Sequence, residues 1–461
     1  MKKIVYTLLF IAASLTAINT TAQMRTSYFM EGSYFRTELN PALAPTRGYI
    51  ALPAMSGVGV SLSNNFLSVN NLFYKNNGEV VTALHGSVSA DKFLNRLPKT
   101  GFIGANINAN ILGVGFHTKR SFWSFGINLR SSNDITVSKD MFTALKSLGN
   151  GHYDLNNTSF HSTSYLEVYI GNARKVADLS FGNLSVGAKV KVLVGLLNAS
   201  SQIEQMYADI TPENVLGRMN GRLRASGVIL DPKKGVAGQE LTEDVLCYDD
   251  INKILGNIKN FGAAIDLGAE MKLLDNKLRV SAAITDLGFI KWSKNTHIEA
   301  EAHADFSFNG VNLSTGETQS DGSAEIYMAE VKKPGYATRL NCSLNFGAEY
   351  NILNDHIGFG VLSHTEFRHN KSLSELTLSV NFRPANWFSA TFSHTLLNRN
   401  RLGVLGFALN LHPKGINLFL GADYIPMKFV TYQNIPVPYN LKSFNLYFGL
   451  GFNLGRAKMK Q

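Results

Sequence analysis

The stretch "SFNLYFGLGFNLG", residues 443–455, decides the fold class. Side chains of a strand alternate between its two faces, so every second residue shares a face. One face here is an unbroken apolar row of Phe444, Leu446, Phe448, Leu450, Phe452 and Leu454. The opposite face is small or polar, with Ser443, Asn445, Tyr447, Gly449, Gly451 and Asn453. Strands of a soluble sandwich and of a membrane barrel both fit this pattern, so the rest of the chain must distinguish them.

Other segments repeat the alternation, and they carry their charges on one face only. In residues 183–195, Lys189 and Lys191 share a face that lies opposite a row of valine, leucine and alanine. In residues 261–274, Asp266 and Glu270 do the same. Arg or Lys at the lipid midplane of a barrel costs about 2–4 kcal/mol, whereas a lumen tolerates charge. The pattern therefore predicts lipid on one face and a lumen on the other.

About fourteen segments of this kind occur, and the connections between them alternate in length. They lie near 49–63, 102–117, 122–131, 163–173, 183–195, 261–274, 277–288, 338–350, 356–367, 373–383, 386–396, 402–412, 415–425 and 441–455. Short links follow the even-numbered segments, and long links follow the first, third, fifth and seventh. Membrane barrels have short periplasmic turns and long external loops. We predict an all-β fold, a transmembrane antiparallel up-and-down barrel of about 14 strands with an N-terminal plug.

The chain start and the composition agree with export to a membrane. Residues 1–22 contain Lys2 and Lys3, a short apolar run and small residues before Gln23, which is typical of a signal peptide. No later apolar run approaches the length of a spanning helix, and the mean hydropathy is −0.03. We predict a signal peptide (1–22), a plug segment (23–47), a barrel (48–455) and a tail (456–461), located in the outer membrane of a Gram-negative bacterium.

No sequence motif indicates catalysis, a cofactor or a metal. There is no complete dinucleotide fingerprint, no Walker A sequence, no His-Glu-x-x-His and no Gly-x-Ser-x-Gly. His364, His369 and His394 lie on or near neighbouring segments rich in serine, which is compatible with a hydrolase site inside the barrel. Histidines near serines are also expected by chance in a barrel so rich in serine, and we favour this explanation. Basic and acidic residues are interspersed, which argues against a nucleic-acid partner. We expect no enzyme activity, no cofactor and no metal.

One short motif between the predicted signal peptide and the first strand resembles a known family. Asn40-Pro41-Ala42 resembles the Asn-Pro-Ala element in the N-terminal hatch of the FadL-type long-chain fatty acid transporters. The stretch "TDLGFIKW", residues 285–292, is similar to strand ends in the wider FadL-like and PorV-like group. The whole chain resembles an uncharacterised outer-membrane family within that group. The resemblance implies a fourteen-stranded barrel that is plugged by its N-terminal segment.

The resemblance implies two alternative functions. The first is a passive, porin-like channel for hydrophobic or amphipathic small molecules. The second is a non-transporting PorV-like barrel that scaffolds protein secretion or surface assembly through a protein partner at its loops. Outer-membrane lipid and the barrel-assembly machinery are expected partners in both cases.

A shift in the alternation near Ile111 indicates an irregular strand. The apolar parity runs through Ala109 and Ile111, then moves by one residue to Leu112. Such a slip predicts a β-bulge, which bends a strand and interrupts pairing. By resemblance to the FadL type, the candidate lateral opening comprises Ala109, Asn110, Ile111, Leu112 and Gly113. A similar slip at Val361-Leu362 favours the alternative of an ordinary bulge without an opening.

Overall fold

The structure is a computed structural model that describes residues 25–455 with internal gaps. The gaps are 54–56, 67, 77–78, 148–150, 212–213, 229–235, 238–239, 242–251, 253–255, 313–316, 331–334, 370–371, 398–403, 426–428, 433–434 and 439–442. The predicted signal peptide and C-terminal tail lie outside the described residues.

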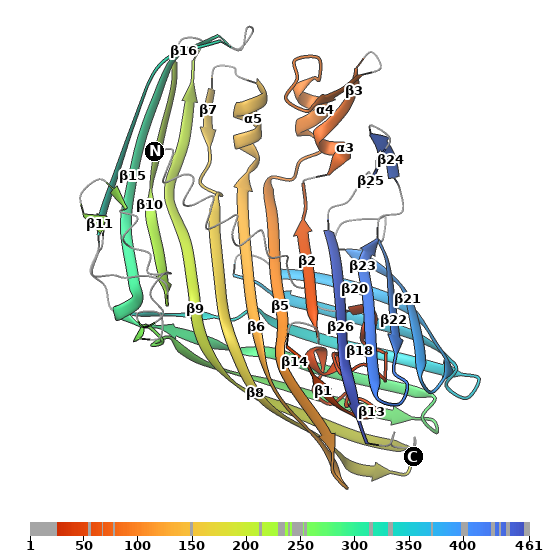
Figure 1. Cartoon of the computed structure of the whole chain (residues 1–461). Helices are drawn as coiled ribbons and strands as arrows, with labels where there is room; N and C mark the ends of the chain where they lie inside the picture. Colours follow the sequence, from red (N-terminus) through yellow and green to blue (C-terminus); the bar gives the residue numbers. More distant parts are fainter. Residues whose placement is uncertain are drawn as a thin grey trace.

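Fourteen antiparallel strands close into a barrel (Figure 1). The first barrel strand is formed by β1 and β2 together, and β26 closes the ring by pairing with both. Each other strand pairs with its neighbours in chain order, as the fold prediction requires. In that order the barrel strands are β1 (Gly48–Ala51) with β2 (Val58–Asn64), β5 (Thr100–His117), β6 (Ser121–Ser138), β8 (Ser159–Leu179), β9 (Gly182–Ile210), β13 (Phe261–Leu273), β14 (Leu278–Trp292), β18 (Cys342–Ile352), β19 (Ile357–Phe367), β20 (Ser372–Ala385), β21 (Phe388–Leu397), β22 (Val404–Leu411), β23 (Ile416–Ile425) and β26 (Ser443–Leu454).

The alternation seen in the sequence separates the two faces of the wall. On β26, Leu446 is 52% exposed and Phe448 is also exposed, while the intervening Tyr447 is 3% exposed. On β9, Val190 and Val192 are exposed, whereas Lys189 and Lys191 are buried in the interior. The apolar parity therefore faces outward and the polar parity faces the lumen, as predicted.

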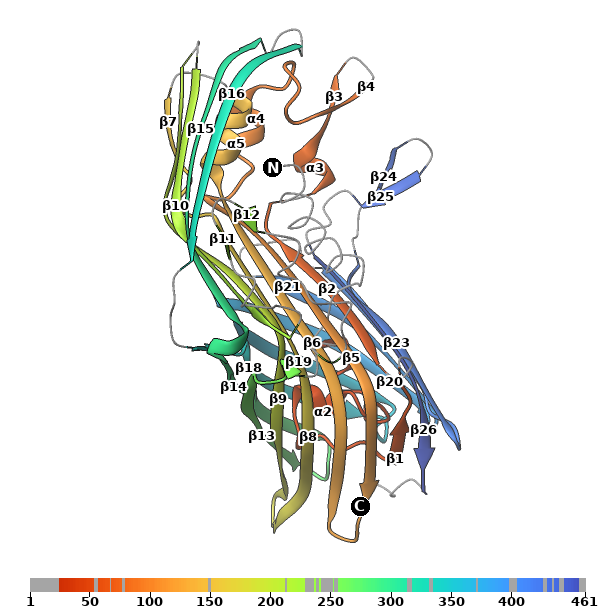
Figure 2. The same ribbon diagram turned by 60° about the vertical axis from the view of Figure 1, so that its left-hand side comes forward.

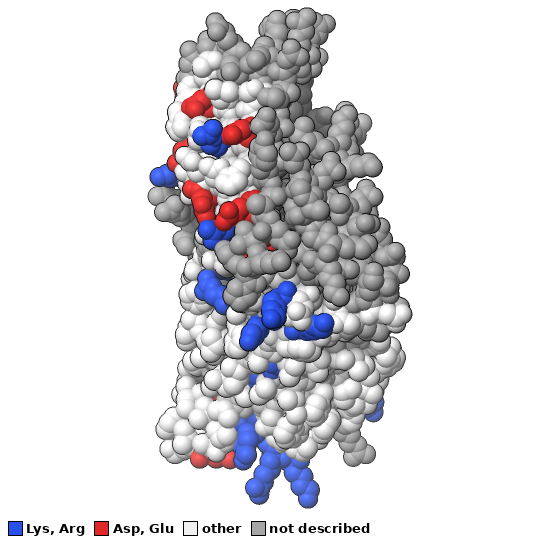
Figure 3. Space-filling model, turned by 90° about the vertical axis from the view of Figure 1, so that its left-hand side faces the viewer, with Lys and Arg blue, Asp and Glu red and all other residues white. Residues whose placement is uncertain are grey.

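Several strands rise beyond the barrel on the side of the long connections, which is the external side in membrane barrels. Figure 1 shows β7, β9, β10, β15 and β16 extending past the barrel rim. Helices α3, α4 and α5 stand above the mouth (Figure 2). Acidic and basic side chains lie together on this outer extension, above a largely uncharged stretch of the wall (Figure 3). The elements outside the barrel are β3 (Phe73–Asn76), β4 (Glu79–Thr82), β7 (Gly151–Asp154), β10 (Asn214–Gly227), β11 (Val236–Ala237), β12 (Glu240–Leu241), β15 (His297–Asn312), β16 (Glu317–Glu330), β17 (Tyr336–Arg339), β24 (Phe429–Tyr432), β25 (Ile435–Pro438), α3 (Val69–Leu72), α4 (Ala90–Leu94), α5 (Lys139–Ser147) and η4 (Lys294–Thr296).

Two details differ from the sequence prediction. The span 196–260 was expected to be a loop, but β9 continues to Ile210 and pairs there with β10. The slip expected at Val361-Leu362 does not occur. β19 stays in register with both neighbouring strands there. Leu362 instead points inward and is fully buried against Leu39 and Leu43.

Among the described residues, no helix is both long enough and apolar enough to cross a membrane.

Candidate functional site

Residues 25–47, which we call the inner segment, lie inside the barrel. The segment contains η1 (Arg25–Ser27) and α2 (Arg36–Leu39) and is almost entirely buried. Its hydrogen bonds reach strands around the ring: the Tyr28 hydroxyl contacts Ser281 Oγ on β14 (2.9 Å), and Asn417 on β23 donates to the Gly32 carbonyl (2.8 Å). Inward-facing polar side chains thus satisfy an irregular backbone that would otherwise lose its hydrogen bonds to water.

The Asn-Pro-Ala turn docks on β13 and β14. Asn40 is fully buried, and its side-chain amide donates to the Tyr28 hydroxyl (3.2 Å) and to the carbonyls of Ala269 and Ala282 (3.3 and 3.4 Å). Its Oδ1 accepts the backbone N–H of Ala42 (2.9 Å), which fixes the turn. The motif therefore binds its own turn to two adjacent wall strands.

Glycines on the wall make room for this turn. A Cβ at Gly187 on β9 would overlap the Pro41 backbone, and a Cβ at Gly268 on β13 would overlap Asn40 Oδ1. Backbone can approach this closely only where the wall has no side chain. These two lumen-facing glycines are thus contact sites for the inner segment.

A buried set of charges also holds α2. Glu38 forms ion pairs with Arg130 on β6 and with Lys189 on β9, the latter with an Nζ–Oε1 distance of 2.8 Å. Arg130 also pairs with Glu167 (3.3 Å). Next to this set, Lys191 contacts three carboxylates, those of Glu167, Asp266 and Asp286, at 3.5, 2.8 and 2.6 Å. Opposite charges compensate one another in this dry interior, as buried ions require.

The first strand is broken beside the inner segment. β1 ends at Ala51, opposite Gly113 of β5 and Gly451 of β26, and β2 resumes at Val58, opposite Ala109 and Phe448. Seven residue steps on the first strand (51 to 58) thus face four on β5 (109 to 113) and three on β26 (448 to 451). Because these counts differ, regular pairing of the first strand with both neighbours cannot continue over this interval, which we call the strand break; residues 54–56 within it lie outside the described residues.

A β-bulge on β5 faces the strand break at the position predicted from the slip. The pairing of β5 with β6 shifts between Asn110 and Leu112, and Ile111 is the extra residue. Ile111 and Leu112 are both exposed (36% and 44%), while Asn110 points inward and donates to Asn128 Oδ1 (2.8 Å). The bulge therefore places two consecutive apolar side chains on the lipid face.

Inside the strand break there is little free space. A cavity of about 10 Å³ is bordered by Tyr34, Phe35 and Glu38 of the inner segment and by Gly57 and Asn110 of the wall, among others. That volume accommodates about one water molecule. The backbone N–H of Asn110 donates to the Gly57 carbonyl (2.8 Å), which closes one edge of the break. A cavity of this size does not hold an organic molecule, so passage of one requires the described residues around it to move.

A cross-lumen ion pair lies on the outer side of the inner segment. Arg368, just after β19, reaches Asp134 on β6 with Nε–Oδ1 and Nη2–Oδ1 distances of 2.9 and 2.6 Å. Its Nη2 also donates to Asn106 Oδ1 on β5 (2.5 Å), and its Nη1 pairs with Glu366 (3.0 Å). The guanidinium thus bridges opposite parts of the wall, and sequence reasoning did not identify it.

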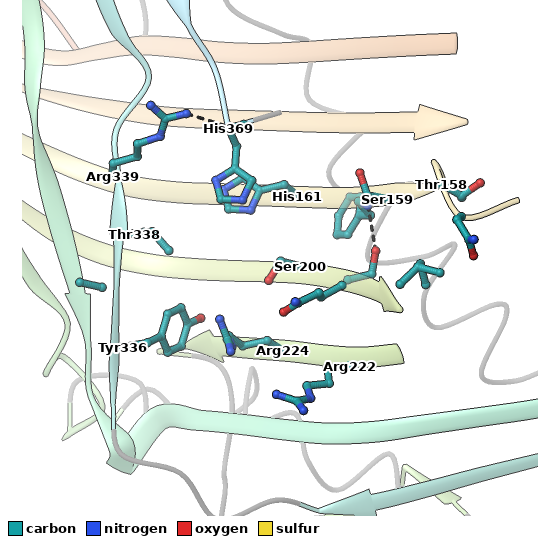
Figure 4. Close-up of a pocket in the computed structure, with 16 residues that line it drawn as sticks. Thr158, Ser159, His161, Ser200, Arg222, Arg224, Tyr336, Thr338, Arg339 and His369 are labelled. Carbon is teal, nitrogen blue, oxygen red and sulfur yellow. Dashed lines mark hydrogen bonds between the residues drawn. The ribbon is translucent and has the colours of Figure 1, made fainter. Parts of the chain in front are cut away.

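Beyond this bridge a larger cavity, which we call the mouth pocket, opens between β8, β9, β10, β17 and the end of β19. Its volume is about 460 Å³. Figure 4 shows His161 and His369 on one side, Arg222, Arg224 and Tyr336 on the other, and Ser200 between them. The mouth pocket is large enough to hold a small organic ligand.

His364 and His369, which the sequence made candidates for hydrolase chemistry, do not lie in one site. His364 is buried in the interior, where its Nδ1 lies 2.7 Å from Asn345 Oδ1. His369 instead stacks on His161 at the mouth, with ring centroids 4.3 Å apart. Of the two, only His369 borders a cavity large enough for a ligand.

The chain matches one protein family and is similar to several solved barrel structures. The model described as "Family of unknown function (DUF5723)" matches residues 41–423, so the chain belongs to that family. No curated protein matches the sequence. Among solved structures the chain is similar to the Ralstonia pickettii toluene transporter TbuX (9% identity, 92% and 95% of the two chains, TM-score 0.43). It is also similar to the Pseudomonas putida toluene transporter TodX (10%, 90% and 91%, TM-score 0.36) and to the translocator domain of the autotransporter NalP from Neisseria meningitidis (9%, 88% and 88%, TM-score 0.26).

Proposed function

We propose that this member of the DUF5723 family is an outer-membrane channel through which hydrophobic or amphipathic small molecules pass passively. The observation that carries the proposal is the strand break, with the β-bulge of β5 beside it and the inner segment directly behind it. Register shifts also occur between other pairs of wall strands, so the bulge of β5 supports the proposal because it lies opposite an interruption of the neighbouring strand. A wall that releases cargo sideways needs a place where backbone pairing is already interrupted.

The outer surface supports a membrane location. Exposed apolar side chains such as Val190, Phe448 and Phe452 alternate with buried polar ones on each barrel strand. A soluble protein would pay a large free-energy cost for so much exposed apolar surface, whereas lipid removes that cost. We place the barrel in the outer membrane of a Gram-negative bacterium.

In the proposal the inner segment is a hatch that blocks the axial route. It fills the lumen with buried side chains and is bonded to strands on several sides, so straight passage to the periplasm is closed. Cargo that reaches the space near Phe35 leaves through the strand break between Gly57 and the bulge of β5. The residues proposed to line this exit are Ala109, Asn110, Ile111, Leu112 and Gly113.

Deleting Ile111 tests the proposal. Without Ile111, the interval on β5 beside the strand break shortens from four residue steps to three, the same number as on β26. Because the extra residue is gone, β5 can pair regularly with β6 and the bulge disappears. We expect uptake of a fluorescent fatty acid by vesicles that contain the purified protein to fall at least tenfold. The matched control is Ile111→Ala, which shortens the side chain but keeps the extra residue, and its uptake should stay close to that of the parent.

Folding must be verified in both variants. Heat-dependent migration on gels and the β-type circular dichroism spectrum should match those of the parent protein. Unchanged uptake by a folded Ile111 deletion variant would refute the lateral exit.

A further inference from the structure

The mouth pocket combines positive charge with a hydroxyl-rich lining. Its described lining includes three arginines and two histidines but no Asp or Glu, and only Phe160, Ile203 and Ala337 are apolar. Hydroxyl and amide side chains supply most of the remaining surface; they are Asn156, Thr158, Ser159, Ser200, Ser201, Gln202 and Thr338. A purely hydrocarbon ligand would displace water from the charged groups of this lining without offering them a hydrogen bond.

The arginines keep donors available after their protein contacts are counted. Arg224 pairs with Glu299 at 3.3 Å and lies over the Tyr336 ring, with its Cζ 4.8 Å from the ring centroid. Its Nε is buried and has no hydrogen-bond acceptor among the described residues. Arg222 contacts Glu204 and a second glutamate, Glu301, at 3.4 and 3.9 Å. Because a guanidinium carries five N–H donors, one or two carboxylate contacts leave several of them free for a ligand.

The opposite side of the mouth pocket supplies a second set of donors. Arg339 donates from Nη2 to the backbone carbonyls of Arg368 and His369 (2.9 and 3.2 Å), and neither of these neutral acceptors cancels its charge. His161 is buried; its Nε2 contacts Thr163 Oγ1 (3.2 Å), while its Nδ1 has no partner in the part of the chain that the structure describes. Two residues that line the cavity from opposite sides, Arg224 and His161, thus each contain a buried nitrogen without a partner among the described residues.

From this arrangement we infer that the mouth pocket binds a small hydrophilic organic anion, one that carries a phosphate or carboxylate group on a hydroxylated body. Arginine forks recognise both oxyanions bidentately. The volume of about 460 Å³ lies within the ~300–1,000 Å³ range of small-molecule sites and far exceeds that of an inorganic ion. This inference goes beyond the proposed channel function, because it concerns a different ligand class and is tested by binding rather than by passage.

The test is titration calorimetry on the full-length protein in lipid nanodiscs, with empty nanodiscs as the blank. The probes are glucose 6-phosphate, glucuronate, neutral glucose and octanoate. We expect the phosphate and the hydroxylated carboxylate to bind at least tenfold more tightly than glucose and octanoate. Equal binding of glucose, binding of octanoate as tight as that of glucuronate, or no binding of either anion would overturn the inference.

Variants connect the binding to the mouth pocket. Arg222→Gln and Arg339→Gln each remove a partly or fully exposed guanidinium from the lining, so neither endangers the fold. Each should weaken glucose 6-phosphate binding at least tenfold, since each removes a charged donor. The matched control is Arg218→Gln on the same face of β10, whose partner is Asp305 (2.7 Å) and which does not line the pocket. If Arg218→Gln weakened binding as much as the other two did, the site would lie elsewhere.

Discussion

The ion pairs of Glu38 should decide how firmly the inner segment stays in the barrel. Replacing Glu38 with Gln keeps the size and one oxygen acceptor but removes the charge shared by Arg130 and Lys189. Lys189 is 1% exposed and would keep the face of the Tyr169 ring, 4.6 Å away, and the attraction of Asp266, whereas Arg130 would keep Glu167. Removing one partner of a buried pair costs about 3–5 kcal/mol. Because both cations keep a contact, we expect a value near the lower end, about 3 kcal/mol.

Hydrogen exchange measures this cost directly. The backbone N–H groups of Thr37, Glu38 and Asn40 donate to carbonyls within the inner segment, at Tyr34, Phe35 and Arg36. If exchange requires undocking, a cost of about 3 kcal/mol should accelerate exchange roughly 150-fold at these amides, since 1.4 kcal/mol is a factor of ten. Amides of barrel strands such as β20 should be unaffected.

A surface ion pair provides the control for Glu38→Gln. Asp305→Asn removes the exposed partner of Arg218, a contact expected to contribute about 0–1 kcal/mol. It should leave exchange in the inner segment unchanged. Unaltered exchange in Glu38→Gln would refute the idea that Glu38 holds the inner segment in the barrel. Equal acceleration across the whole barrel would refute the idea that the inner segment undocks while the wall stays folded.

Three further predictions concern the wall, the cross-lumen bridge and the mouth pocket. Gly268→Val should displace the Asn-Pro-Ala turn, because a Cβ there overlaps it, and should raise ion conductance in planar bilayers while the barrel still folds. Arg368→Gln should lower the free energy of unfolding by about 3–5 kcal/mol by leaving Asp134 buried without its cation, and adding Asp134→Asn should recover part of that loss in urea titrations. Burial, with the stacked His369 and with Arg368, lowers the pKa of His161 to about 4, so His161 is neutral near pH 7. A bound anion favours the protonated imidazole, so glucuronate, whose carboxylate stays ionised in this range, should bind more tightly at pH 5 than at pH 7 in calorimetry.

The sequence predicts the barrel well because lipid imposes a strict rule on each strand. A charged residue at the wrong parity would face hydrocarbon. Lys189 and Lys191 therefore indicate which face of the strand points to the lumen, even though their ion-pair partners cannot be read from the sequence. The same rule located the bulge at Ile111, since a slip must be absorbed by an extra residue. It failed at Val361-Leu362, because the apolar Leu362 faces inward to pack on the inner segment.

The outer extension escaped prediction because no lipid acts on it. β10 and the end of β9 lie above the barrel, where the requirement for one apolar face is lifted, and residues 196–260 therefore read as a loop. The polar contacts of the lumen were missed for another reason. Arg368 and Asp134 are 234 positions apart, and Glu38 and Lys189 are 151 apart. Pairings at such separations leave no local pattern in a single sequence.

The order of contacts along β5 gives the proposed route a sequence of barriers. Asn106 binds the cross-lumen Arg368, Asn108 and Asn110 border the small cavity behind the strand break, and Ile111 follows at the bulge. A molecule that enters from outside thus meets the mouth pocket first, then a buried ion pair, and only then the exit. The ion pair must open before cargo reaches the exit, while a ligand in the mouth pocket need not cross it. Binding at the mouth and passage through the wall are therefore physically separate steps, and variants at Arg339 and at Ile111 act on different ones.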